Sequence, residues 1–160
     1  MNNFTQAMKF TSKWEGFFSN DKADPGGKTK YGVSDKADGT IDGMIDLDRD
    51  GTGDVAVEAL TTEQALKYYM DYYWTPAGCD ALELPMAIAV FDTAVNCGVS
   101  RAKRWLRQTA NRKEFITKRR EYYYEIIENR PTFSKFKNGW LNRLNDLTKY
   151  TDILAKEMVP

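Results

Sequence analysis

The sequence contains no histidine, and this absence excludes several classes of enzyme. Ser-His-Asp and Cys-His nucleophilic sites need an imidazole base, and most catalytic zinc sites use histidine as a ligand. Cysteine is scarce as well: Cys79 and Cys97 are too few for a disulfide framework, and we expect both to be buried, reduced thiols. Acid–base chemistry in this protein therefore falls to carboxylates, and no cofactor is expected for catalysis.

Long hydrophobic runs are also missing. The first residues show neither a basic flank nor an apolar stretch, so we expect no signal peptide, no membrane insertion and synthesis in a cytoplasm. No repeat, low-complexity tract or Pro/Gly/Ser linker divides the 160 residues, which predicts one domain over 1–160 and a monomer.

Charge is balanced overall but not along the chain. Residues 1–100 hold 8 basic and 16 acidic side chains, whereas residues 101–160 hold 15 and 7. The basic stretches attract an anionic polymer such as a cell-envelope glycan, or form a solvated helix face that pairs with the acidic half. No specific nucleic-acid partner is expected. These stretches are Arg101–Arg107, Arg112–Lys113 and Lys118–Arg120.

Hydrophobic periodicity predicts a mainly α fold. An irregular region with loops or a few short strands is expected at about 19–60, where Gly, Asp, Asn and Lys dominate. Thr61 and Gln64 form a capping-box pattern at the start of a helix, and the segment 86–97 is apolar nearly all round, as a central buried helix would be. Helices are predicted at about 4–16, 62–74, 86–97, 100–109, 113–128 and from 136 onward.

Glu15 is the first candidate catalytic residue. It lies at the end of the first predicted helix, among Trp14, Phe17 and Phe18. A carboxyl group in an apolar setting has a raised pKa, so it can still hold the proton that a glycosidase must give to the leaving oxygen. The alternative is a surface glutamate that ends a helix.

The glycine-rich segment after Glu15 supplies the other candidates. Asp24 precedes Pro25-Gly26-Gly27, and an ionised aspartate in a polar turn suits the guidance of water or the stabilisation of a charged sugar. Thr29 is a candidate for holding the water, and Tyr31 for contacting substrate. Asp24 is alternatively a simple turn former, and Thr29 and Tyr31 alternatively hydrogen-bond within the turn.

An acidic segment matches the first nine positions of an EF-hand calcium loop, with oxygen side chains at alternate positions and glycine at the sixth. The twelfth position is Val57 rather than glutamate, and Glu58 follows one place later. We expect either a structural calcium ion in the 46–58 loop or a solvated acidic turn that imitates the pattern. The predicted ligands are Asp46, Asp48, Asp50, Thr52, Asp54 and Glu58.

Asp92 and Asn96 lie one helical turn apart on the otherwise apolar central helix. Buried polar groups on such a helix usually satisfy backbone atoms of neighbouring loops. The alternative is that Asp92 and Asn96 line a sugar-binding cleft.

Several motifs resemble one family. Glu15-Gly16 followed by an aromatic residue, and then Asn20-Asp21 to Tyr31-Gly32-Val33, are similar to the opening of the N-acetylmuramidases of glycoside hydrolase family 108, found among phage and prophage endolysins. Further segments continue the likeness: 60–65, 72–76, 91–98, 115–120 and 136–143. The part from about 100 to 160 resembles a region of that family described as a predicted peptidoglycan-binding region.

The resemblance implies a lysozyme-like muramidase that hydrolyses the β-1,4 bond between N-acetylmuramic acid and N-acetylglucosamine. By position, the family's catalytic glutamate falls on Glu15. Phage-type lysozymes, a related group, use a Glu, an Asp nine positions later and then a Thr, which is close to the spacing of Glu15, Asp24 and Thr29. Phe17 stands where relatives usually have a second glycine, which implies a narrower cleft beside the acid.

A phage endolysin of this kind acts on the cell wall after a separate membrane-permeabilising protein, a holin, lets it through. The alternatives are a secreted antibacterial effector, a chitosanase-like glycosidase with another sugar preference, and a non-catalytic wall-binding module.

Overall fold

Helices dominate the part of the chain that this computed structural model describes, namely residues 2–16, 22–24 and 27–160. The chain divides into unit 1, which holds Met1–Phe10 and Tyr73–Pro160, and unit 2, which holds Thr11–Tyr72. The mainly α fold predicted from the sequence is confirmed. The prediction of one domain stays a prediction, because two such units occur within single domains as well as between domains.

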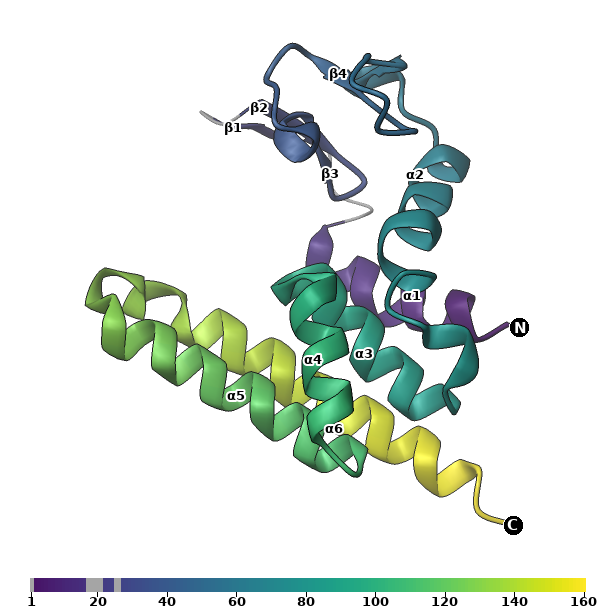
Figure 1. Cartoon of the computed structure of the whole chain (residues 1–160), viewed down its shortest axis with the longest axis vertical. Helices are drawn as coiled ribbons and strands as arrows, with labels where there is room; N and C mark the ends of the chain where they lie inside the picture. The colour runs from purple at the N-terminus through teal and green to yellow at the C-terminus, as the bar shows by residue number, and fades with distance from the viewer. Residues whose placement is uncertain (1, 17–21, 25–26) are drawn as a thin grey trace. The chain divides into compact units, whose positions relative to one another are not determined.

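Unit 1 is helical. The α1 helix spans Asn3–Glu15 and begins in this unit, and its last turn belongs to unit 2. The longer helices of unit 1 are α3 (Leu84–Cys97), α4 (Val99–Gln108), α5 (Arg112–Asn129) and α6 (Lys137–Glu157) (Figure 1). A short 3-10 turn at Cys79–Ala81 precedes α3, and another at Pro131–Phe136 joins α5 to α6. Among the described residues, no helix combines the length and the apolar composition that crossing a bilayer requires.

The α3 helix is the centre of the unit 1 core. Pro85 lies in its first turn, where the missing N–H costs no hydrogen bond, and Ile88, Val90 and Phe91 have no exposed surface. Full burial of such side chains contributes about 1.5–3 kcal/mol each. The α4, α5 and α6 helices all pack against α3, so the helix predicted from its uniformly apolar sequence is the one that the others cover.

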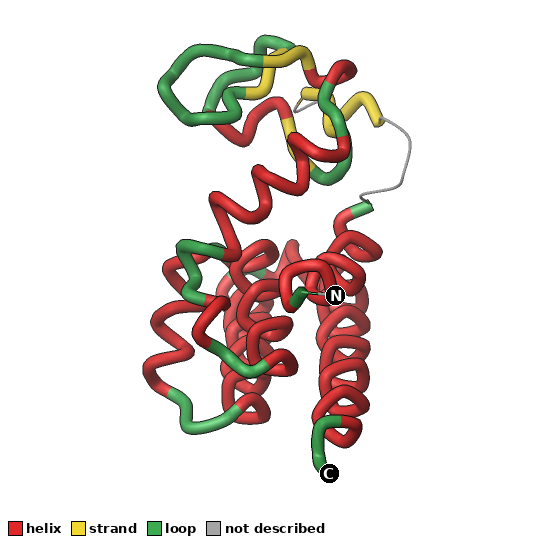
Figure 2. The backbone as a smooth tube through the Cα atoms, turned by 90° about the vertical axis from the view of Figure 1, so that its right-hand side faces the viewer, coloured by secondary structure: helices red, strands yellow, loops and turns green. Residues whose placement is uncertain are grey.

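Unit 2 contains all the described strands (Figure 2). The strands β1 (Lys22–Asp24), β2 (Gly27–Lys30) and β3 (Val33–Ser34) form an antiparallel sheet in chain order. A second pair consists of β4 (Met44–Ile45) and β5 (Val55–Ala56), with 3-10 turns at Asp35–Asp38 and Val57–Ala59. The expected irregular region with short strands is therefore present.

The α2 helix (Thr62–Tyr69) closes unit 2. Thr61 caps it: its hydroxyl accepts the Gln64 N–H at 3.1 Å, and the Gln64 side chain accepts the Thr61 N–H at 2.9 Å. This is the capping box expected from the sequence. The predicted helix ran to Trp74, but Met70–Trp74 has the wider winding of a π-helix, which no sequence period indicated.

Candidate active site

Glu15 is the last residue of α1, and its side chain is half-buried, like that of Trp14. Gly16 follows with φ of +68°, the left-handed conformation that commonly ends helices and that glycine adopts without steric cost. The other two predicted aromatic neighbours, Phe17 and Phe18, lie outside the described residues. The local sequence therefore explains why the helix ends beside the candidate acid.

A two-residue turn joins β2 to β3 and packs against Glu15. Tyr31 and Gly32 have φ of +50° and +76°, as in the type I′ hairpin, and the register confirms that Lys30 pairs directly with Val33. A Cβ atom added at Gly32 would lie 3.1 Å from the Glu15 Cβ. The glycine thus allows the turn to approach the end of α1 closely.

Tyr69 of α2 fixes the same turn from another side. Its hydroxyl donates to the Tyr31 carbonyl at 3.3 Å, and a Cβ atom added at Gly32 would clash with that hydroxyl oxygen. Glu15, the Tyr31-Gly32 turn and Tyr69 are therefore brought together. No local pattern in the sequence indicates Tyr69, because the contact joins residues 38 positions apart.

The same three-stranded sheet contains the backbone of Asp24 and Thr29. Asp24 ends β1 and pairs with Gly27, and the half-buried Thr29 pairs with both Lys22 and Ser34. The side chain of Asp24 and the residues Pro25 and Gly26 lie outside the described part of the chain. The sheet thus places both predicted residues in the ladder whose β2–β3 turn contacts Glu15.

Asp35 holds this sheet to the following loop and was not singled out from the sequence. Its buried carboxylate accepts the N–H groups of Asp42 and Gly43 at 3.0–3.2 Å. A Cβ atom added at Gly27, where φ is +103°, would lie 3.1 Å from the Asp35 Cβ. Gly27 therefore serves both the backbone conformation and the approach of this carboxylate.

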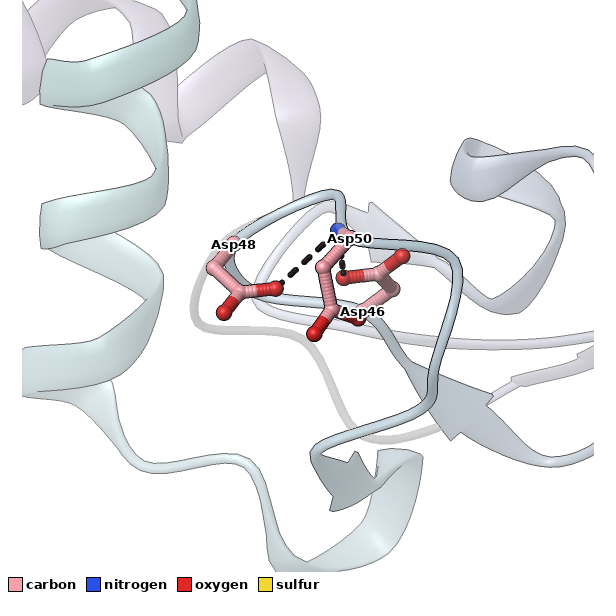
Figure 3. A group of neighbouring side chains, drawn as sticks. All are labelled: Asp46, Asp48 and Asp50. Carbon is pink, nitrogen blue, oxygen red and sulfur yellow. Dashed lines mark hydrogen bonds between the residues drawn. The ribbon is translucent and has the colours of Figure 1, made fainter.

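The predicted calcium loop brings three carboxylates together. Asp46, Asp48 and Asp50 each offer an oxygen within 4.8 Å of the others. Figure 3 shows the three side chains beside one another on this loop. The Asp46 carboxylate accepts N–H groups from Asp50 at 3.2 Å and Gly51 at 2.8 Å, and Gly51 has φ of +96°. Asp54 Oδ2 accepts the Leu47 N–H at 2.7 Å, which holds the loop in a curled form. Alternating carboxylates around a curled backbone fit a hard cation such as Ca²⁺.

The electrostatics of the loop differ between its carboxylates. Desolvation raises the pKa of Asp46, but backbone N–H groups of Gly51, Arg49 and Asp50 outweigh it, so the net pKa is lowered. At Asp48 the N–H of Asp50 lowers the pKa, whereas desolvation and the charges of Asp50 and Asp54 together raise it. Like charges therefore oppose one another here, and a bound cation would relieve that repulsion.

The end of the loop differs from a complete EF-hand. Val57, at the twelfth position, is fully buried. Glu58, the predicted substitute, forms an ion pair with Lys28, and its backbone carbonyl accepts a hydrogen bond from Lys30 Nζ at 2.5 Å. The Glu58 side chain thus pairs with Lys28 of β2 rather than with a metal ion in the loop.

Asp92 lies in a buried ion network in unit 1. Its carboxylate accepts hydrogen bonds from Arg119 of α5 at 2.7 Å and Arg143 of α6 at 2.8 Å, and Asp92 and Arg119 have no exposed surface. Desolvation opposes the charge on Asp92, but the two arginines outweigh it and lower the pKa of Asp92 to about 2. The geometry supports an internal charge-pairing role and gives Asp92 no surface for a sugar.

Asn96, one turn along α3, joins the same network. Its side-chain oxygen accepts from Arg119 at 3.2 Å and from the Tyr123 hydroxyl. The Tyr123 hydroxyl also accepts from Arg119 Nε at 2.7 Å. Asp92 and Asn96 thus share a face, as their spacing indicates, but their partners are side chains of other helices rather than loop backbone.

A carboxyl group lies at a helix end, against a glycine turn, in a mainly α protein that contains no histidine. Lysozyme-type glycoside hydrolases use carboxyl groups for their catalysis. The chain belongs to glycosyl hydrolase family 108, because the model of that family, described as "Glycosyl hydrolase 108", matches residues 8–98. Neither a curated protein nor a solved structure matches the chain.

The matched range contains Glu15, Asp24, Thr29 and Tyr31. The protein is therefore a glycoside hydrolase with the mainly α, lysozyme-like fold expected from the sequence, and membership implies an enzyme that degrades peptidoglycan. Residues 99–160 lie beyond the match, so a peptidoglycan-binding role for that part stays a prediction.

Proposed function

We propose that the protein is an N-acetylmuramidase that hydrolyses the β-1,4 bond between N-acetylmuramic acid and N-acetylglucosamine. The observation that carries the proposal is the family match, which covers the segment where the Glu15 end of α1 meets the β2–β3 turn. The reaction needs a carboxylic acid at the bond and a second group on the sugar or the water. Both candidate groups lie on this short stretch of chain.

Glu15 acts in this proposal as the general acid that protonates the leaving oxygen. Asp24 positions water or stabilises positive charge on the sugar, Thr29 assists with the water, and Tyr31 contacts substrate. The contact of the Tyr31-Gly32 turn with Glu15 supports this assignment, because it fixes the acid relative to the strand that carries Thr29. Proton NMR of the nascent product shows whether the anomeric configuration is inverted or retained.

The test is hydrolysis of purified peptidoglycan by wild type, Glu15→Gln and Asp24→Asn, followed as loss of turbidity. Positioned general acids contribute about 10²–10⁴-fold, so Glu15→Gln should lose activity by that factor. Glu63→Gln is a matched control, since Glu63 is an exposed glutamate in the first turn of α2. Full activity of Glu15→Gln in folded protein would refute the assignment.

Mass analysis of the released fragments tests the substrate. A muramidase leaves N-acetylmuramic acid at the new reducing end, whereas a chitosanase-like enzyme cleaves glucosamine polymers and spares peptidoglycan. Fragments with N-acetylglucosamine at the reducing end would also contradict the proposal.

We further propose a phage endolysin that is made in a bacterial cytoplasm, works as a monomer and reaches the wall through a separate permeabilising protein. The family resemblance supports this route. Expression in a bacterium should leave cells intact until a holin is co-expressed, and lysis should then require Glu15. Lysis of untreated neighbouring cells without a holin would favour the secreted effector instead.

We propose calcium as a structural ion in the 46–58 loop, held by Asp46, Asp48 and Asp50 with Thr52 and Asp54 in support. The close approach of the three carboxylates supports this. Calcium should raise the thermal midpoint of wild type relative to chelator, and Asp48→Asn with Asp50→Asn should abolish that rise. An equal rise of the thermal midpoint in wild type and in the double variant would disprove calcium binding at this loop.

A further inference from the structure

Unit 1 contains a pocket of about 490 Å³ between α4, α5 and the 3-10 turn Pro131–Phe136. Its lining includes Arg101 and Arg104 of α4, Tyr122 of α5, Arg130 and Phe133. Ligand pockets have volumes of about 300–1,000 Å³, so this one admits a small molecule or a short segment of a polymer. The three arginines come from two separate stretches of the chain and line the same pocket.

None of the ion pairs among the described residues involves Arg101, Arg104 or Arg130. Arg112, Arg119 and Arg143 differ from them, since each has an aspartate partner. The pocket therefore holds three arginines that no carboxylate among the described residues pairs with.

Two of these arginines are already positioned. Arg101 donates to the Cys97 carbonyl at 2.9 Å and lies over the Tyr122 ring, with 4.6 Å from the guanidinium carbon to the ring centroid. Arg130 lies 5.7 Å from the Phe133 ring centroid. Stacking of this kind fixes the planar donor fork, so less conformational entropy is lost when an anion binds.

The charge of the pocket selects the ligand. Glu125 is the one carboxylate among the lining residues, so the lining has three positive charges against one negative charge. Guanidinium forks match phosphate and carboxylate oxygens in geometry. Tyr122 and Phe133 also line the pocket and add aromatic surface beside the arginines.

We propose that this pocket binds a ligand with at least two oxyanion groups, phosphate or carboxylate. This binding function is separate from hydrolysis, because the pocket contains none of the candidate catalytic residues. It also assigns a site within residues 99–160, which the family model does not cover.

The test is titration of Glu15→Gln protein with three probes, followed by NMR shifts of backbone amides and by calorimetry. The probes are inorganic phosphate, a glycerol phosphate oligomer and a peptide with two glutamates, all at physiological ionic strength. Using the Glu15 variant separates the two proposals, since binding should persist where hydrolysis is lost.

The decisive comparison uses two double variants of α4. Arg101→Gln with Arg104→Gln should weaken binding about tenfold or more, because two charge-assisted hydrogen bonds are lost. Lys103→Gln with Arg107→Gln removes the same charge from the same helix outside the pocket and should change binding less than twofold. Arg130→Gln alone, at an exposed position, gives a third measurement if the first pair unfolds the helix.

The relative affinity of the probes identifies the source of the oxyanion, a phosphate polymer or an acidic peptide. If both double variants weaken binding equally, the attraction is diffuse and the proposal that this pocket binds the ligand is overturned. Absence of binding by all three probes would overturn it as well.

Discussion

The buried network around Asp92 makes the sharpest stability prediction. Asp92→Asn keeps the shape of the side chain but removes the negative charge that Arg119 and Arg143 both contact, and it turns an amide donor toward guanidinium donors. Removing one partner of a buried ion pair costs about 3–5 kcal/mol. The total free energy of unfolding of a domain is about 5–15 kcal/mol, so a urea titration should detect this loss clearly.

Asp152→Asn is the matched control. Asp152 pairs with Arg112 at 2.7 Å, but its side chain is 39% exposed, against 0% for Asp92. Solvent screens such a pair, so its loss should cost about 1 kcal/mol or less. Equal costs for the two substitutions would show that burial of the Asp92 network does not stabilise the fold.

The pH dependence provides a second readout. The pKa of Asp92 falls from 3.8 to about 2 on folding, which corresponds to about 2 kcal/mol. Because the folded value is the lower one, this stability is complete above about pH 4 and is lost as the pH falls toward 2. The difference in unfolding free energy between wild type and Asp92→Asn should therefore shrink over that range. A constant difference between pH 7 and pH 2 would refute the reasoning.

Three further outcomes are expected. Gly32→Ala should destabilise the protein by about 1–3 kcal/mol in urea and reduce hydrolysis, because φ is +76° and the new Cβ meets the Tyr69 hydroxyl; an unchanged midpoint would contradict this. Thr61→Ala should cost about 1 kcal/mol by removing the capping bond to Gln64, whereas Thr61→Ser should cost little. The Cys79 thiol, whose pKa burial raises to about 12, should resist a thiol reagent in native protein and react on unfolding; rapid labelling of folded protein would contradict the burial.

Local signals in the sequence were enough to predict most of the helices. The cap at Thr61, the proline in the first turn of α3 and the apolar run that follows it depend on neighbours within a few residues, so they can be read directly. The winding of Met70–Trp74 could not be predicted, because a π-helix depends on packing rather than on a residue period.

The partners of charged groups were harder to predict. Arg119 belongs to a basic stretch that the sequence allows to be a solvated face, yet the structure buries it completely against Asp92. The pairing of the basic part with the acidic part was anticipated, but these two residues are 27 positions apart and no periodicity links them. For Glu15, the sequence indicated the helix end, and only the fold shows that the Gly32 turn contacts it.

Val57 has a consequence for how this protein could evolve. Substitution of Val57 by glutamate would complete the EF-hand sequence pattern, but the side chain at this position has no exposed surface. The desolvation of a new carboxylate would offset the gain in ion affinity. Any calcium bound by the loop is therefore held without the bidentate twelfth ligand, which suits the millimolar concentrations outside cells better than the submicromolar levels within them.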